Sequence, residues 1–177
     1  MRCLRACRLL LLPIQVLVAI LAGCSRPPIS SSSIPMNYKS TQFDSISKAV
    51  FEYQISREYA GIGGIKNRNA YPYACFLWIE EAPHHDPSKR LLSYFPYKHP
   101  LVRKYSDAIQ TQMGARDKST GKYGMILFMG KVTWLSKDNV VTEPAGGANS
   151  PSGRITVIRQ KDGNWKVTNE EHEPGSI

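Results

Sequence analysis

Acidic residues are scarce in this chain, and cysteines are scarce after its first 24 residues. Fourteen Asp and Glu face 23 Lys and Arg, which gives a formal net charge of +9, and Cys75 is the only cysteine beyond Cys24. One cysteine in the rest of the chain cannot form a disulfide there, so we expect a fold without disulfides and a buried, unreactive Cys75. Long runs of like charge are also missing, which argues against a nucleic-acid-binding tail.

No apolar run is long enough to cross a bilayer as a helix. The longest, Leu9–Ala22, has 14 mostly apolar residues, whereas a membrane-spanning helix needs about 20. Arg2, Arg5 and Arg8 precede this run with no acidic residue among them. A basic segment followed by a short apolar run is typical of an export signal. We therefore predict that the chain is exported.

The end of this run and the two residues after it carry a more specific pattern. Leu21-Ala22-Gly23-Cys24 resembles the lipobox of bacterial lipoproteins at all four positions. The resemblance implies that the Cys24 thiol receives a diacylglyceryl group, that signal peptidase II cleaves between Gly23 and Cys24, and that the new amine is acylated. Ser25, rather than Asp, resembles outer-membrane sorting, so in a host with two membranes we expect attachment to the outer membrane, facing the periplasm. An ordinary secretory signal is the alternative.

This interpretation divides the chain into three parts. Residues 1–23 are the predicted signal peptide, residues 24–43 a Ser/Pro-rich tether, and residues 44–177 one folded domain. Cleavage removes three arginines and no acid, so the charge falls from +9 to +6. Residues 25–42, as a flexible coil, would span about 23 Å. The mildly basic domain would then lie near an anionic membrane surface.

Two helices and a series of strands are expected in the domain. The first helix should start at Asp44 as its N-cap and end at Gly61-Ile62-Gly63-Gly64. The second should use Asp86 as its N-cap and Pro87 as its first residue and run to Phe95. The expected strands are 70–80, with both faces buried, then 101–110, 124–135, 140–143, 154–160 and 165–169. Asp162-Gly163 predicts a tight hairpin between the last two strands.

The expected fold class is therefore α+β. A curved antiparallel sheet of four to six strands should pack on one long N-terminal helix, with a short second helix. This order, and the ending Gly163-x-Trp165-x-Val167, resembles the cystatin-like and nuclear-transport-factor-two-like rolls. The resemblance implies a curved sheet wrapped around the long helix and indicates no particular function.

Motifs for catalysis, metal binding or cofactors are missing or incomplete, so we predict no catalytic residue, metal or cofactor. His84-His85-Asp86 lacks the spacing of metal ligands and is expected to be an exposed loop. Residues 119–122 read Ser-Thr-Gly-Lys but lack the first glycine and the final Ser or Thr of a phosphate loop, so we predict a polar turn over residues 116–124. A Gly-x-Ser-x-Gly nucleophile elbow is not found.

Aromatic side chains offer the one plausible ligand site. They could line a cavity inside the roll, although core packing is the simpler interpretation; they are Trp78, Trp134, Trp165, Tyr53, Tyr73 and Tyr94. We predict a membrane-anchored, non-catalytic module that binds a small apolar ligand or an envelope protein, and no nucleic acid. The alternative is a lipid-anchored enzyme with its site in the cone of the roll.

Overall fold

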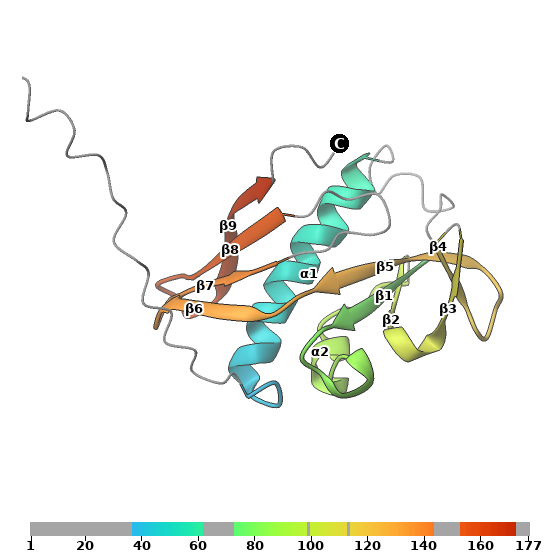
Figure 1. Cartoon of the computed structure of the whole chain (residues 1–177), viewed down its shortest axis with the longest axis horizontal. Helices are drawn as coiled ribbons and strands as arrows, with labels where there is room; N and C mark the ends of the chain where they lie inside the picture. The colour runs from blue at the N-terminus through green and yellow to red at the C-terminus, as the bar shows by residue number, and fades with distance from the viewer. Residues whose placement is uncertain (1–36, 62–72, 99, 113, 144–152, 173–177) are drawn as a thin grey trace, which may run out of the picture. The chain divides into compact units, whose positions relative to one another are not determined.

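The structure is a computed structural model that describes residues 37–61, 73–98, 100–112, 114–143 and 153–172 (Figure 1). The predicted signal peptide, Cys24 and most of the predicted tether lie outside the described residues. So do the expected helix end at 62–64 and most of the loop 146–153.

The long N-terminal helix, α1, spans Thr41–Gly61. Its start is capped by Ser40, whose Oγ accepts a hydrogen bond from the Phe43 N–H at 3.1 Å. The prediction of Asp44 as N-cap was therefore wrong. The Asp44 side chain is 1% exposed and instead accepts hydrogen bonds from the Ser88 hydroxyl, 3.0 Å from each carboxylate oxygen. Ser40 takes the capping role because Asp44 is used to join α1 to the second helix.

The second helix, α2, spans Lys89–Ser93 and is also capped by a serine rather than the predicted aspartate. Ser88 Oγ accepts the Leu91 N–H at 2.9 Å. Asp86 instead accepts hydrogen bonds from the N–H and hydroxyl of Ser106, both at 2.7 Å. The prediction of Asp86 as cap was wrong because a partner from a later part of the chain occupies its carboxylate.

Five strands form a mixed sheet in the order β2-β1-β5-β4-β3. Their bounds are Ala74–Ile79 for β1, Leu101–Lys104 for β2, Ala108–Thr111 for β3, Gly114–Asp117 for β4 and Tyr123–Met129 for β5. β1 runs parallel to both β2 and β5, while β4 is antiparallel to β3 and β5. Both faces of β1 are buried, as predicted. Cys75 and Leu77 belong to the main core beside α1, and Phe76 belongs to a smaller cluster with Ala74 and Ala115.

This five-stranded sheet is strongly curled. The expected strand 101–110 is interrupted by the short 3-10 helix η2, Tyr105–Asp107, which joins the edge strand β2 to the opposite edge strand β3. In a flat sheet these edges would be about 19 Å apart, whereas a 3-10 helix of this length advances only about 8 Å. The two edges must therefore approach each other. The ion pair between Arg103 on β2 and Asp117 on β4, 2.9 Å from Nε to Oδ2, crosses the same concave side.

The other four strands form an antiparallel sheet in chain order: β6 (Val132–Ser136), β7 (Asn139–Thr142), β8 (Gly153–Arg159) and β9 (Trp165–His172). The Asp162-Gly163 hairpin is confirmed, with Gly163 at φ +85°. The expected strand 124–135 divides at Gly130, between β5 of one sheet and β6 of the other. A Cβ on Gly130 would lie 2.6 Å from the Glu143 carbonyl oxygen, so the crossing requires glycine.

The expected α+β class, with one long and one short helix, is confirmed. Helix α1 contacts both sheets and α2, and Figure 1 shows it beside β8 and β9. Its buried face includes the expected Ile46, Ala49 and Val50. These residues share one core with Leu77 of the five-stranded sheet and Ile155 of the four-stranded sheet. None of the helices in the described ranges is long and apolar enough to cross a membrane.

Candidate functional site

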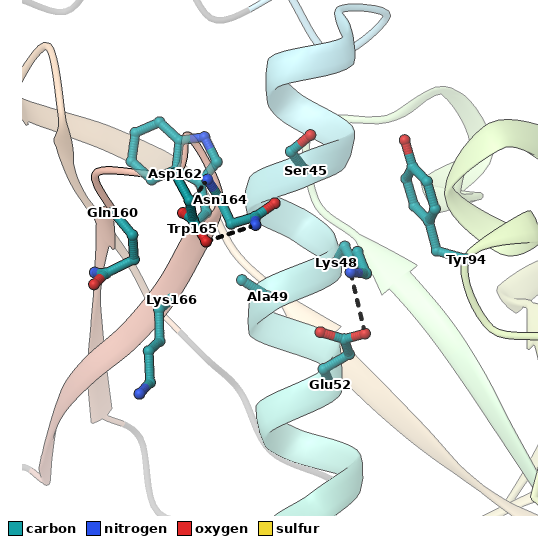
Figure 2. Close-up of a pocket in the computed structure, with 10 residues that line it drawn as sticks. All are labelled: Ser45, Lys48, Ala49, Glu52, Tyr94, Gln160, Asp162, Asn164, Trp165 and Lys166. Carbon is teal, nitrogen blue, oxygen red and sulfur yellow. Dashed lines mark hydrogen bonds and ion pairs between the residues drawn. The ribbon is translucent and has the colours of Figure 1, made fainter.

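A groove of about 400 Å³ crosses the N-terminal half of α1. Figure 2 shows the β8–β9 hairpin on one side of the helix and Tyr94, the residue after α2, on the other. The lining comes from three parts of the chain that the fold brings together: Ser45, Lys48, Ala49 and Glu52 of α1, Tyr94, and Gln160, Asp162, Asn164, Trp165 and Lys166 of the hairpin. Most of these lining residues have polar or charged side chains.

The hairpin wall has a rigid backbone. The Gln160 N–H donates to the Asn164 carbonyl at 2.7 Å, and the Gly163 N–H donates to the Gln160 carbonyl at 2.9 Å. The Asn164 N–H and side-chain amide each donate to the Asp162 carboxylate at 3.0 Å. These bonds hold the turn together, and the side chains of Gln160, Asp162 and Asn164 line the groove.

The floor and the far wall belong to the two helical segments. Ser45 and Ala49 are one helical turn apart, and their small side chains leave space above α1. Lys48 and Glu52 form an ion pair at 3.5 Å, with both side chains 40% exposed. The Lys48 ammonium lies 5.7 Å from the centre of the Tyr94 ring. A ligand in the groove would thus meet charged groups and an aromatic ring.

The groove holds two carboxylates and two ammonium groups. The backbone N–H of Asn164, and then its side-chain amide, lower the pKa of Asp162 below the ordinary value of an aspartate. Asp162 is therefore ionised at neutral pH and can accept hydrogen bonds but not donate a proton. The formal charges of Lys48, Lys166, Glu52 and Asp162 sum to zero over the groove.

A second hollow, of about 500 Å³, lies between α2 and β2. It combines the apolar side chains of Leu92 and Val102 with the charged Arg103 and Lys104. These charges already have partners in the fold. Arg103 pairs with Asp117, and Lys104 lies 3.8 Å from Asp86 and 3.9 Å from Asp107. The groove over α1 has more polar side chains in its lining than this hollow, so we take the groove as the candidate ligand site.

The aromatic residues named from the sequence do not line one common cavity. Trp165 and Tyr94 both border the groove. Trp134 packs edge-on against Trp165, with ring centres 5.8 Å apart. The other three lie elsewhere: Tyr53 donates a 2.6 Å hydrogen bond to Glu170, the Tyr73 ring faces the Lys122 ammonium at 4.4 Å, and Trp78 stacks on the five-stranded sheet.

Trp78 is part of a ladder of rings. It stacks between Phe128 of β5, at 4.0 Å, and His85, at 4.2 Å, and Tyr105 approaches it edge-on at 6.4 Å. His84 and His85 both have positive φ, at 55° and 59°, which is uncommon for residues other than glycine. The stacking on Trp78 and the contact of His85 Nδ1 with the Ile79 carbonyl at 3.3 Å hold this turn in place.

The three residues His84-His85-Asp86 thus have different surroundings. His84 is exposed, as predicted, whereas His85 is half-buried against Trp78 and Asp86 binds Ser106. Across the described ranges, no three His, Cys, Asp or Glu side chains come together in a group that could hold a metal ion.

The polar turn expected over residues 116–124 is shorter in the structure, because β4 continues to Asp117 and β5 starts at Tyr123. The Asp117 carboxylate accepts the hydrogen bonds that hold this turn. Burial would by itself raise the pKa of Asp117, but hydrogen bonds from Ser119 and the Thr120 N–H, with the nearby Arg103 guanidinium, lower it below the ordinary value. The carboxylate therefore stays ionised although its side chain is fully buried. It stabilises the turn and the curl of the sheet.

Sequence reasoning had named Trp165 and Tyr94 as candidates for a ligand cavity but had not placed Lys48, Glu52 or Gln160 at a site. No local pattern marks those three, because the groove forms only when residues 45–52, 94 and 160–166 meet. Comparison with family models, curated proteins and solved structures gave no match, so the groove must be interpreted from its own geometry.

Proposed function

We propose that this is an exported lipoprotein, anchored to a membrane by lipid on Cys24, whose domain is a non-catalytic binding module of the cell envelope. The observation that carries the proposal is the sequence Leu21-Ala22-Gly23-Cys24 directly after a basic segment and a short apolar run. In a cell with two membranes, Ser25 favours the outer membrane, with the domain in the periplasm.

A lipid anchor agrees with the position of the domain in the chain. Helix α1 begins at Thr41, so 16 residues separate Cys24 from the first helical residue. As a flexible coil this segment would span about 22 Å, enough to let the domain move above the lipid headgroups. Several acyl chains, each gaining about 0.8 kcal/mol per buried methylene, would hold the protein at the membrane stably.

The groove over α1 supports binding rather than catalysis. Acid–base hydrolysis at such a site would need a protonated carboxyl group as the acid. The lowered pKa of Asp162 makes it a poor proton donor, and Glu52 is paired with Lys48. The alternative, a lipid-anchored enzyme, is favoured only by the presence of these two carboxylates in one groove.

The anchor can be tested by expressing the full chain in a bacterium that processes lipoproteins. We expect incorporation of labelled fatty acid, recovery in the membrane fraction, and an N-terminal peptide starting at lipid-modified Cys24 in mass spectrometry. Cys24→Ala should abolish the label and release the protein from the membrane. Cys7→Ala is the matched control and should change neither, because Cys7 lies in the segment that we expect to be removed. Membrane attachment of Cys24→Ala would overturn the proposal.

A further inference from the structure

We propose that the groove between the β8–β9 hairpin and Tyr94 binds a neutral saccharide. This inference rests on the proposed role of the domain as a binding module and adds the chemical class of its ligand. It is carried by the charge balance of the groove, by its supply of side-chain hydrogen-bonding groups, and by the ring at its edge.

The charge balance favours a neutral ligand. Lys48 and Lys166 contribute two positive charges, and Glu52 and Asp162 contribute two negative ones, all within one lining. A phosphate or polyanion binds best where cationic groups are in excess, and a cationic ligand where acids are in excess. A groove with no net charge has no such preference, but it can form many hydrogen bonds.

The hydrogen-bonding groups of the hairpin wall are side chains rather than main-chain groups. The turn uses its own N–H and C=O groups in the bonds between Gln160, Gly163 and Asn164. These bonds occupy main-chain groups at the tip of the hairpin, so a peptide adding a strand would pair along the edge of β9 rather than with the turn. Side-chain carboxylates and amides can instead bind pairs of hydroxyl groups, because each has two polar atoms that point the same way.

The Tyr94 ring supplies the remaining element of saccharide recognition. Tyr94 is half-buried against the core, so its ring has a stable position at the edge of the groove, opposite the hairpin (Figure 2). The C–H face of a sugar ring is apolar and packs on an aromatic face, while its hydroxyl groups point outward to polar partners. Trp165, 9% exposed, forms part of the opposite side.

The size of the groove agrees with a short saccharide. Small-molecule sites have volumes of about 300–1,000 Å³, and this groove holds about 400 Å³. That volume suits one or two sugar units of a chain, with the rest of the chain outside. The side-chain amide of Gln160, which has one donor and one acceptor group, would also suit an acetamido group.

The test uses the full-length lipidated chain, purified in detergent and titrated with tetramers of N-acetylglucosamine and of glucose. Binding is followed by calorimetry and by tryptophan fluorescence, to which Trp165 should contribute. We expect saturable binding to at least one tetramer. Tyr94→Ala should weaken it about tenfold, equivalent to about 1.4 kcal/mol. Tyr97→Ala, at a ring 41% exposed outside the groove lining, is the matched control and should leave the affinity unchanged.

A second variant keeps the test valid if Tyr94→Ala does not fold. Gln160 is exposed, and Gln160→Ala should weaken binding about fivefold by removing one hydrogen-bonding group. The inference is overturned if neither tetramer binds, if neither variant weakens binding, or if a polyanion such as a heparin fragment binds more tightly than both tetramers.

The same experiment separates this inference from the proposed function. If no saccharide binds but Cys24→Ala still releases the protein from the membrane, the ligand class is wrong and the lipoprotein proposal stands. If the tetramer binds and chromatography shows that it is cleaved, the saccharide inference stands and the non-catalytic part of the proposed function fails.

Discussion

The two sheets of this domain are built in opposite ways. The four-stranded sheet joins β6, β7, β8 and β9 in chain order, each antiparallel to the next. The five-stranded sheet places β1 between β2 and β5, parallel to both, and its two edges come from consecutive strands. One sheet is therefore specified by local turns, and the other by pairings between distant segments that a curl brings together.

Because the two sheets differ in this way, their common packing against α1 is what joins them into one domain. Residues from both sheets pack in the same core around the helix, Leu77 from β1 and Ile155 from β8 among them. The curled sheet also has a cluster of its own around Phe76, on the side away from α1. We therefore expect the two sheets to unfold in one transition. Substitutions on the concave side of the five-stranded sheet should disturb mainly the structure of that sheet.

The largest expected effect tests this shared core. Leu77→Ala and Ile155→Ala each remove a fully buried side chain, one from each sheet. Each should lower the free energy of unfolding by about 2–5 kcal/mol, because the transfer free energy is lost and a cavity is left. Urea unfolding followed by both circular dichroism and tryptophan fluorescence measures this loss. Both variants should keep a single transition that is the same by the two probes.

Two separate transitions in either variant would show that the sheets are independent units. Ile109→Ala is the control, because Ile109 is 51% exposed on the edge strand β3. It should change the free energy of unfolding by less than about 0.5 kcal/mol.

An intermediate effect is expected from Asp117→Asn, which removes the negative charge from the concave side of the curled sheet. The variant loses the ion pair with Arg103 and weakens the hydrogen bonds from Ser119 and Thr120. At pH 7 we expect a loss of about 1–3 kcal/mol, as for hydrogen bonds to charged groups. Asp138→Asn, at an exposed turn of the other sheet, should cost less than about 0.5 kcal/mol.

The pH dependence of this effect has a definite sign. The pKa of Asp117 is lowered in the folded chain, so near the ordinary aspartate pKa of about 3.9 the unfolded chain binds more protons than the folded one. The stabilisation is therefore complete well above pH 4 and is lost as the pH falls through the folded pKa. Urea unfolding at pH 7 and at low pH should show the two proteins converging in acid. A difference that grows in acid would contradict the lowered pKa.

The smallest expected effect compares one turn from each sheet. Gly121 joins β4 to β5 and Gly163 joins β8 to β9, at φ +69° and +85°, and neither would place a new Cβ closer than 3.9 Å to a neighbour. Replacing either glycine with alanine should therefore lower the free energy of unfolding only by the backbone strain, about 1–2 kcal/mol. The melting temperature should fall by about 2–4 °C for each kcal/mol. Asparagine, which tolerates positive φ, should cost less at both sites. An unchanged melting temperature for Gly163→Ala would contradict the φ of this turn.

The parts of the fold that local patterns determine could be predicted from the sequence. The apolar spacing of Ile46, Ala49 and Val50 indicated the buried face of α1. Asp162-Gly163 indicated the last hairpin, and the apolar residues around Cys75 indicated a strand buried on both faces. Each of these signals lies within a few residues, and in these three cases the distant contacts agree with it.

The parts that depend on distant partners could not be predicted in the same way. Asp44 and Asp86 each had the residue type of a helix cap, but Ser40 and Ser88 cap the helices while the two carboxylates bind groups from other elements. The division of the chain into two sheets at Gly130 depends on the Glu143 backbone. The groove, likewise, needs Tyr94 and a hairpin more than 60 residues later to meet over α1.

The parallel pairing of β1 with β5 also affects the order in which the chain can fold. β1 begins at residue 74 and β5 at residue 123, so a long loop must close before these strands can pair, whereas the β8–β9 hairpin needs only a short turn. Contacts between distant residues form slowly because the loop entropy is lost before they are made. We therefore expect β8 and β9 to form early and β1 to be covered late. Cys75, fully buried in the native core, would be reachable by oxidants during that interval, so the exposure of this thiol should depend on how fast the chain folds as well as on the stability of the native state.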